Sequence, residues 1–426
     1  MKTYARYKDS GISWIGDVPE HWNCLKIKRL FDEDDEKNEN GEFELLSFSK
    51  NKGLIYYKDN NEKEPSAGDL TKYRVVHTGQ LLENRMQAWH GMFICVDKEG
   101  CVSPDYSVFN ANKRTVGSVK YYEYCFRLPM WVQQFANESR GIGDGFNRLY
   151  TSQFHKIMAI VPPPSEQKAI AEYLDKKTAQ INELVSAKQK QIELLKEYKQ
   201  SVIANAVTGK LDERREKRKW KDSGISWIGK IPENWEKLPF CALFEQKSQC
   251  GYCDEELLSV YLDKGVIRFS EGGEKRANAT SEDLSKYQLV DVGDFVLNNQ
   301  QAWRGSVGVS FFRGIVSPAY VILKMSEKIE RNFGNYLLRD RSMVAMYCIC
   351  SKGVGSIQRN LVWNKLKRMP IFVPPLSEQK EIVAYIEKKV ASIDSQIASI
   401  ENQIVNLSEY KQSLISDVVT GKVKVC

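Results

Sequence analysis

Two long segments of the chain repeat apolar residues at the seven-residue spacing of a coiled coil. One segment spans 162–210 and the other spans 374–426. The residues that share this spacing are Leu174, Ile181, Leu195, Val202, Ile386, Ile393, Ile400, Leu407 and Leu414. We interpret them as one position of a helix-helix seam. We place the companion position of the seam at Ile170, Leu184, Tyr198, Ile382 and Tyr410, with Gln191, Gln396 and Gln403 as polar members that help to set the register.

Start and stop residues mark the ends of these helices. The prolines at 162–164 stop a strand-like run, and Ser165 is a suitable N-cap with Glu166 in the first turn. Gly209 and Gly421 follow the last periodic residues and suit the left-handed position after a helix. We therefore expect two helices of similar length.

The remaining sequence has shorter patterns. Strand-like runs bounded by turn residues occur at 43–49, 92–96, 294–298 and 320–324, and one helical stretch precedes each proline block. This predicts modules of mixed α/β structure.

The chain contains the same frame twice. KDSGISWIGDVPEHW at 8–22 returns as KDSGISWIGKIPENW at 221–235, and VPPPSEQKAI at 161–170 returns as VPPLSEQKEI at 373–382. Each half is long enough to bury its own core. We divide the chain into a first module with its frame segment (1–161), a first spacer helix (162–210), a linker with the second frame segment and module (211–373), and a second spacer helix (374–426).

A duplicated frame predicts two modules related by an approximate two-fold axis. Helices related by that axis and packed along their seams run antiparallel, and forty-odd residues span roughly 60 Å at 1.5 Å per residue. Such a rod suits a protein that reads two DNA segments at a fixed separation. A symmetric scaffold that joins two protein partners would have the same geometry, so both interpretations stay open at this point.

Composition narrows the class of protein only modestly. Of 426 residues, 62 are basic and 55 acidic, and the net charge of +7 permits a polyanionic partner without requiring one. No apolar run suits a membrane span or a secretory signal, so we expect a cytoplasmic protein. The four histidines all lie in the first half, and a lone C-x-x-C at 250–253 has no second pair, so we expect no metal site.

The usual signatures of an enzyme are missing. Gly-Lys at 209, 229 and 421 is never followed by Ser or Thr, so no phosphate-binding loop is predicted. Ser103–Tyr106 and its counterpart Ser317–Tyr320 resemble the loop with which amino-methyltransferases hold a flipped base, but they lack its second proline. We interpret the acidic stretch 32–42 as a solvated turn, and we expect no catalytic residue.

The motifs W-x-G-x-[VI]-P-x-x-W and V-P-P-x-x-E-Q-K, each present twice and each V-P-P motif followed by a long helix, closely resemble the specificity subunit of Type I restriction-modification enzymes. The matching residues are Trp14, Gly16, Pro19, Trp22, Pro162, Pro163, Glu166, Gln167 and Lys168, repeated as Trp227, Gly229, Pro232, Trp235, Pro374, Pro375, Glu378, Gln379 and Lys380. The likeness covers essentially the whole chain. It implies two target-recognition domains that each read half of a split double-stranded DNA sequence, with the helix pair setting the unread gap.

The resemblance also implies partners and cofactors. Two modification subunits would methylate adenine with S-adenosylmethionine, and restriction subunits would add ATP-driven translocation and cleavage with Mg. The specificity subunit itself would catalyse nothing and hold no cofactor. If helix length sets the gap, seven residues added after Val185 together with seven after Ile397 would lengthen it without changing either half-site.

Candidate DNA contacts come from the segments 71–91 and 285–305, which align. Asn84, Gln87, Trp89 and Gly91 recur as Asn298, Gln301, Trp303 and Gly305, so they are frame or shared contacts. The positions that differ are Arg85 with Asn299, Met86 with Gln300, and His90 with Arg304. These are candidate specificity positions because Arg pairs with guanine, and Asn or Gln with adenine. Strand-end surface residues would look the same.

A glycine-rich loop in each half provides a second candidate contact. We match Arg148 with Arg359, near Lys352, as residues that bind phosphate. A tight turn that closes the module is the alternative. For the whole chain, the alternatives to a specificity subunit are a decoy or phase-variable relative, a protein-protein scaffold, and an autonomous nuclease or methyltransferase.

Overall fold

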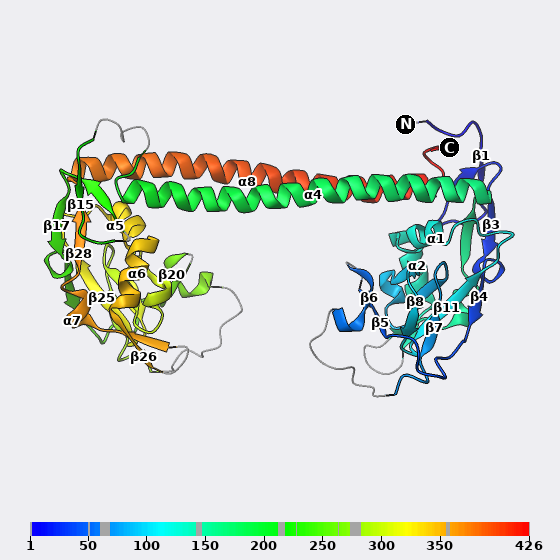
Figure 1. Cartoon of the computed structure of the whole chain (residues 1–426), viewed down its shortest axis with the longest axis horizontal. Helices are drawn as coiled ribbons and strands as arrows, with labels where there is room; N and C mark the ends of the chain where they lie inside the picture. Colours follow the sequence, from blue (N-terminus) through cyan, green and yellow to red (C-terminus); the bar gives the residue numbers. More distant parts are fainter. Residues whose placement is uncertain are drawn as a thin grey trace. The chain divides into compact units, whose positions relative to one another are not determined.

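A computed structural model of the chain describes residues 2–49, 52–59, 69–141, 147–211, 218–226, 228–262, 264–272, 283–354 and 358–425. Trp227 of the repeated motif lies outside the described residues. The chain divides into two compact units: unit 1 is Met1–Gln189 with Glu401–Cys426, and unit 2 is Lys190–Ile400. The predicted mixed fold of two modules joined by two long helices is confirmed (Figure 1).

The two long helices are α4 (Pro164–Val207) and α8 (Leu376–Val419), each of 44 residues. In unit 1, Lys188 donates to Gln403 over 2.5 Å and Lys411 donates to Asn182 over 2.8 Å. Later residues of α4 therefore meet earlier residues of α8, so the helices run antiparallel, as predicted. Each helix continues from one unit into the other, and the division into units falls within both helices rather than at their ends.

The helix seam uses the predicted first position but a different companion position. Among the nine predicted residues, Leu195 and Leu407 are half-buried and the other seven are buried. The predicted companion Leu184 is 45% exposed, and Tyr198 and Tyr410 are exposed as well. Ile192 and Ile397, which lie four residues after the first position, are buried instead.

The glutamines of the predicted companion position also face away from the seam. Gln191, Gln396 and Gln403 are all exposed, but Gln403 still accepts the hydrogen bond from Lys188 across the helix pair. In a seven-residue repeat, successive seam residues are separated alternately by three and by four residues. Here the companion residue lies four residues after the first position. Ile170 and Ile382 are buried, but there the helices pack against the cores of the units.

The helix ends differ slightly from the prediction at the start and agree with it at the stop. Helix α4 begins at Pro164, one residue before the proposed N-cap Ser165, because proline suits the first helical position, where its missing N–H costs no hydrogen bond. Gly209 and Gly421 have φ angles of +77° and +78°, the left-handed conformation predicted after each helix.

Unit 1 is built on an antiparallel four-stranded sheet in the order β4-β11-β8-β9. These strands are β4 (Phe31–Asp34), β11 (Tyr106–Ala111), β8 (Leu81–Asn84) and β9 (Phe93–Cys95). Among the strand pairs outside the sheet are β1 (Tyr7–Asp9) with β2 (Asp17–Pro19), β3 (Asn23–Lys26) with β14 (Met158–Val161), β5 (Leu46–Ser49) with β6 (Gly53–Tyr56), and β7 (Arg74–Val76) with β10 (Gly100–Val102).

Unit 2 repeats these elements in the same order. Its sheet is β18-β25-β22-β23, made of β18 (Phe244–Lys247), β25 (Tyr320–Met325), β22 (Phe295–Asn298) and β23 (Val307–Val309). The surrounding pairs are β15 (Trp220–Asp222) with β16 (Lys230–Pro232), β17 (Glu236–Pro239) with β28 (Pro370–Val373), β19 (Leu258–Tyr261) with β20 (Gly265–Arg268), and β21 (Gln288–Val290) with β24 (Gly314–Val316).

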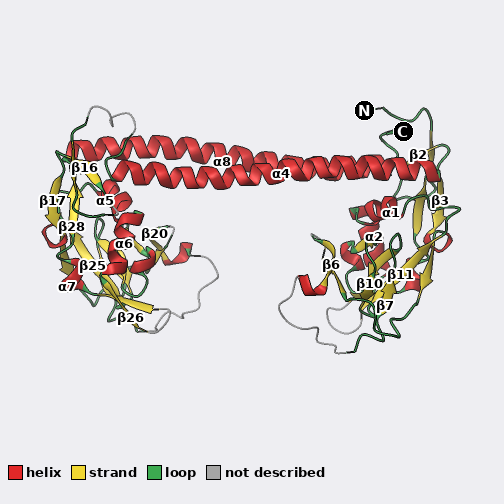
Figure 2. Cartoon of the chain, viewed as in Figure 1, coloured by secondary structure: helices red, strands yellow, loops and turns green. Residues whose placement is uncertain are grey.

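Two helices and a short helical turn precede each proline block, where we expected one helical stretch (Figure 2). They are α1 (Val119–Phe126), α2 (Pro129–Glu138) and α3 (Thr151–Phe154) in unit 1, and α5 (Arg331–Leu338), α6 (Arg341–Ile349) and α7 (Trp363–Leu366) in unit 2. Pro129 separates α1 from α2 because a proline inside a helix removes a hydrogen bond and clashes with the preceding turn. In unit 2, the Asp340 side chain caps α6 instead.

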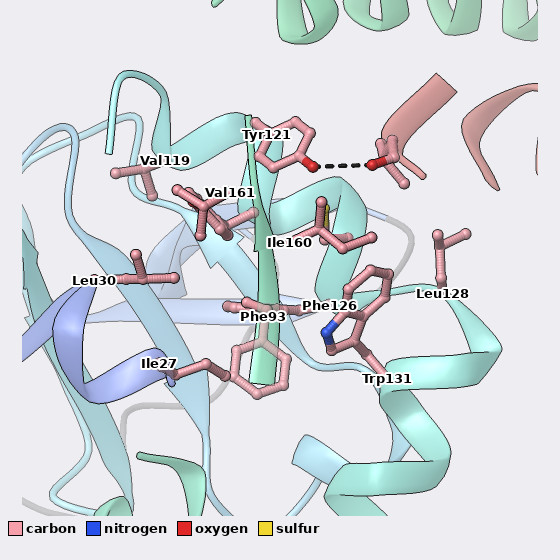
Figure 3. Close-up of a cluster of buried hydrophobic side chains, with 14 of the residues drawn as sticks. Ile27, Leu30, Phe93, Val119, Tyr121, Phe126, Leu128, Trp131, Ile160 and Val161 are labelled. Atoms are coloured by element: carbon pink, nitrogen blue, oxygen red, sulfur yellow. Dashed lines mark hydrogen bonds between the residues drawn. The ribbon is translucent and has the colours of Figure 1, made fainter. Parts of the chain in front are cut away.

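The core of unit 1 joins the sheet, the short helices and the end of α8. Phe93, Phe126 and Trp131 pack together in it (Figure 3). The buried hydroxyl of Tyr121 donates to the carbonyl of Val419 over 2.9 Å, which ties α1 to the last turn of α8. No helix in the described part of the chain is long and apolar enough to cross a membrane.

Candidate nucleic-acid interface

The first copies of the two repeated motifs meet Gly421, the glycine that follows α8, at one corner of unit 1. The Glu166 carboxylate, at the start of α4, accepts hydrogen bonds from Tyr4 (2.9 Å), Trp22 (3.0 Å) and His21 (2.6 Å). Burial opposes ionisation here, but these hydrogen bonds hold the pKa of Glu166 below its usual range. Gly421 lies so close to the ring of Trp22 that an added Cβ would come within 2.9 Å of it.

Unit 2 repeats this corner with its own copies of the motifs. Glu378 accepts from Trp235 (3.1 Å) and Asn234 (3.0 Å), and an added Cβ on Gly209 would come within 2.5 Å of Pro232. The motif residues that carry the family resemblance therefore build the frame. Lys168 and Lys380, the last residues of the E-Q-K motifs, are both exposed.

The loop after β8 has the same internal hydrogen bonds as its copy after β22. The Asn84 side chain accepts from the backbone N–H of Met86 over 3.1 Å, and the Trp89 indole donates to the Met86 carbonyl over 2.9 Å. Asn298 and Trp303 make the same two bonds, of 3.1 and 3.0 Å. These Asn and Trp side chains hold the loop, which accounts for their recurrence.

The second candidate segment lies against this loop in both units. The backbone N–H of Leu149 donates to the Arg85 carbonyl over 3.1 Å, and that of Leu361 donates to the Asn299 carbonyl over 3.2 Å. In unit 1 the segment forms the hairpin β12 (Arg140–Gly141) with β13 (Asn147–Arg148), and in unit 2 it forms β26 (Ser351–Val354) with β27 (Gln358–Leu361). Residues 142–146 and 355–357 of the glycine-rich loops lie outside the described residues.

The same hydrogen bonds show that our match of two arginines is wrong by one residue. Because Leu149 and Leu361 occupy equivalent places, Arg148 corresponds to Asn360, and Arg359 corresponds to the residue before Arg148. Successive side chains of a strand point to opposite faces. Arg148 and Arg359 therefore lie on opposite faces of their hairpins and have different surroundings.

In unit 1 the candidate arginines are bonded to carboxylates. Arg85 donates from Nη2 to Glu33 over 2.7 Å and from Nε to Ser107 over 2.6 Å. Arg148 forms an ion pair with Asp105. Gln87 and His90 are exposed, and the His90 ring lies against that of Trp89 with 3.6 Å between the ring centroids.

Glu33 lies in strand β4 and not in the solvated turn that we expected for the acidic stretch. Burial opposes its ionisation, but hydrogen bonds from Thr151 and Arg74 and the charge of Arg85 lower the pKa of Glu33, so it is charged near neutral pH. Glu83, in β8, is fully buried and burial raises its pKa to about 8. The sequence analysis missed both carboxylates.

In unit 2 the arrangement centres on an aromatic ring that two arginines contact. The guanidinium carbons of Arg304 and Arg359 lie 4.7 and 5.1 Å from the ring centroid of Trp303, within the range of cation-π attraction. Gln300 is exposed beside this group. Asn299 is less available, because its side-chain oxygen accepts from the backbone N–H of Leu361 over 3.0 Å.

The remaining candidates of unit 2 are less informative. Lys352 is exposed and lies opposite Asn360 in the hairpin, and Gln301 is half-buried. Hairpin β26–β27 lies at the end of unit 2 farthest from the long helices (Figure 1). Within the described ranges, no three His, Cys, Asp or Glu side chains gather as a metal site would require, and Cys250 and Cys253 are exposed free thiols.

The two units therefore share one hydrogen-bonded frame and present different side chains from the same two loops. Residues 232–406 match the family model of the Type I restriction modification DNA specificity domain. The EcoKI specificity subunit from Escherichia coli (strain K12) is 25% identical over 312 residues, which cover 67% of this chain but 62% of that protein, less than two thirds of its length. The putative MjaX specificity subunit from Methanocaldococcus jannaschii is 22% identical over 441 residues, 96% of each chain.

Solved structures share the fold at low sequence identity. A chain from a study of complex assembly and conformational transition of the type I R-M system has a TM-score of 0.65 at 13% identity, covering 95% of this chain and 99% of that chain. The HsdS subunit from Thermoanaerobacter tengcongensis has a TM-score of 0.55 at 13% identity, covering 95% and 98%. Part of the chain thus matches the Type I restriction modification DNA specificity domain, and the chain is similar to specificity subunits of Type I restriction enzymes.

Proposed function

We propose that this chain gives a Type I restriction-modification complex its DNA sequence specificity, and that each unit reads one half of a split, gapped target. One observation carries the proposal. The loop after β8 and the loop after β22 keep the same hydrogen-bonded frame, while the side chains between the frame residues differ. This is what two readers of different sequences require, because the frame places each loop and the variable side chains select the bases.

The exposed side chains of these loops have suitable chemistry. Gln87 and Gln300 can each offer a donor and an acceptor to an adenine edge. Arg304 and Arg359 can bind phosphate or guanine, and the ring of Trp303 restrains both guanidinium groups. His90 adds a polar ring in unit 1. Unit 2 therefore offers both base-reading and backbone-binding groups, and unit 1 offers Gln87 and His90.

We further propose that the chain assembles the complex. Two modification subunits would bring S-adenosylmethionine and methylate adenine, and restriction subunits would bring ATP and Mg. The long helices offer surfaces for such partners, because they carry large apolar side chains that stay exposed in this chain. These side chains are Leu184, Leu194, Tyr198, Val405 and Tyr410.

The test is to co-express the chain with the modification subunit encoded beside it and to map N6-methyladenine across the host genome at base resolution. A single split motif with a fixed gap, absent when this chain is omitted, supports the proposal. No new methylation, with both proteins co-purifying, would favour a decoy subunit. Failure to co-purify would favour the scaffold interpretation.

A second experiment tests whether helix length sets the gap. The contacts of Asn182 with Lys411 and of Lys188 with Gln403 show which residues of the two helices lie side by side. Seven residues inserted after Val185 therefore need a matching insertion after Asn406, rather than after Ile397. We expect a longer gap between two unchanged half-sites; a change in either half-site would contradict this role of the helices.

A further inference from the structure

Unit 1 places two arginines beside its recognition loop, and each one contacts a carboxylate from another part of the fold. Arg85 follows β8 and bonds to Glu33 in β4, while Arg148 ends β13 and bonds to Asp105 in the turn before β11. The two ion pairs are adjacent, because the backbone N–H of Arg85 donates to the carbonyl of Asp105 over 3.3 Å.

The structure of unit 2 shows what stands at the four corresponding positions. Strand register equates Glu33, opposite Phe109, with Gln246, opposite Leu323. The backbone N–H of Asn299 donates to the Ala319 carbonyl over 3.3 Å, which equates Ala319 with Asp105.

Each arginine and its carboxylate therefore change together between the two units. Arg85 with Glu33 becomes Asn299 with Gln246, and Arg148 with Asp105 becomes Asn360 with Ala319. Where the arginine is absent, the acid is absent too. Since the frame tolerates neutral side chains at all four positions, the ion pairs serve something that differs between the units.

The geometry of Arg85 leaves one edge of its guanidinium group available. Nε donates to Ser107 and Nη2 donates to Glu33, so these bonds occupy the side edge of the group. Nη1 and the second hydrogen of Nη2 form the end edge, which can donate to two acceptors at once. Glu33 is itself held in place, because Arg74 also donates to it over 2.9 Å.

A carboxylate partner suits an arginine that reads a base better than one that binds phosphate. Phosphate binding depends on net positive charge, and a carboxylate in contact cancels most of it. Guanine O6 and N7 are uncharged acceptors that need two donors in a fixed orientation, and an ion pair provides that orientation. Neither arginine is fully enclosed: 16% of the Arg85 side chain and 25% of the Arg148 side chain are exposed.

We infer that Arg85 and Arg148 each read a guanine in the half-site of unit 1, and that Glu33 and Asp105 are positioning residues that orient them. Unit 2 lacks both guanine contacts at the corresponding positions. This inference rests on the proposed function, since it names the bases that unit 1 selects.

The experiment maps N6-methyladenine in cells that express the modification subunit with wild-type chain, Arg85→Ala, Glu33→Gln, Arg148→Ala or Asp105→Asn. Arg85→Ala should reduce the preference for guanine at one position of one half-site by roughly 5- to 150-fold. Glu33→Gln should weaken the preference at that same position by a smaller factor. Arg148→Ala and Asp105→Asn should act together at a second guanine.

Two controls separate this effect from a general loss of binding. The half-site of unit 2 should stay unchanged in every variant, and Arg114→Ala, at an exposed arginine for which the described residues provide no carboxylate partner, should leave both half-sites unchanged. If Arg85→Ala abolishes methylation, Arg85→Lys decides the matter, because lysine keeps the charge and loses the paired donors. If Arg85→Lys then methylates sites with any base at the former guanine position, the inference is supported.

An unchanged motif would overturn it. If the motif is unchanged but the arginine variants methylate all sites less, the arginines would be phosphate contacts. If both the motif and the level of methylation are unchanged, the ion pairs would only stabilise the fold. Failure of the proposed function looks different, since the wild-type chain would then give no split motif at all.

Discussion

Gln167→Ala should destabilise unit 1 strongly, because Gln167 is fully buried and joins the start of α4 to the loop before α1. Its side-chain oxygen accepts from the backbone N–H groups of Gly117 (2.9 Å) and Ser118 (3.3 Å). Its amide donates to the carbonyls of Thr115 and Pro162, both over 2.9 Å. Alanine would remove these hydrogen bonds and leave buried polar groups without partners.

The expected loss follows from the number of hydrogen bonds. At about 1 kcal/mol of net stability for each bond, Gln167→Ala should lower the free energy of unfolding of unit 1 by about 4 kcal/mol. Gln379, the counterpart in unit 2, makes similar bonds to Glu330 (2.7 Å), Lys328 (2.8 Å) and Pro374 (2.9 Å). Gln379→Ala should therefore lower the stability of unit 2 by about 3 kcal/mol.

Hydrogen-deuterium exchange measures the two units separately in the full chain. In Gln167→Ala, amides in the core strands of unit 1 should lose about a thousandfold in protection, while those of unit 2 keep theirs. Lys168→Ala is the matched control, because Lys168 is adjacent and exposed, and it should change stability by less than about 0.5 kcal/mol. Equal effects of the two substitutions, or a loss below about 1 kcal/mol for Gln167→Ala, would refute the reasoning.

Three further comparisons test other parts of the structure. The pKa of Glu83 is about 8 against an ordinary 4.5, so burying this carboxyl costs more stability as pH rises between these values. Glu83→Leu should therefore stabilise unit 1 by up to roughly 5 kcal/mol at pH 8 and by far less at pH 4. Urea unfolding measures this across the pH range, and a stability gain that does not change with pH would contradict the prediction. Ile397→Ala should lower the free energy of unfolding by about 2–5 kcal/mol in thermal or urea unfolding, whereas Leu184→Ala, at an exposed side chain, should lower it by less than about 0.5 kcal/mol. A larger loss for Leu184→Ala would instead support the companion position that we predicted from the sequence. Arg359→Ala should reduce the slope of log binding constant against log salt by about 0.9, whereas Arg148→Ala, whose arginine is paired with Asp105, should leave the slope unchanged in filter-binding or anisotropy titrations.

Local patterns in the sequence were sufficient for the frame of this protein. The seven-residue spacing identified two helices and the buried first position of their seam, and the glycines after Val207 and Val419 marked where the helices stop. These features depend on neighbours within one or two turns of a helix, so they are visible along the chain. The duplicated motifs also located the two corners where Glu166 and Glu378 bind the buried tryptophans.

The errors arose where distant segments meet. The seven-residue spacing alone allowed either companion position. The residue types could have decided between them, because the position four residues after the first holds Ile192 and Ile397, whereas the position three residues after it holds Gln396 and Gln403. The glycine-rich loops align equally well with Arg148 opposite Arg359 or opposite Asn360. Only the backbone hydrogen bonds of Leu149 and Leu361 select the second alignment.

By itself, therefore, the sequence determined that two helices and two copies of one frame exist, and which loops differ between the copies. The tertiary structure decided which candidate side chains in those loops are exposed and which are bonded to other groups. Arg85 and Arg148 looked like free cations in the sequence, yet Glu33 and Asp105 bind them. The physical reason is that these ion pairs join residues 52 and 43 positions apart along the chain, and only the tertiary fold brings such residues within hydrogen-bonding distance.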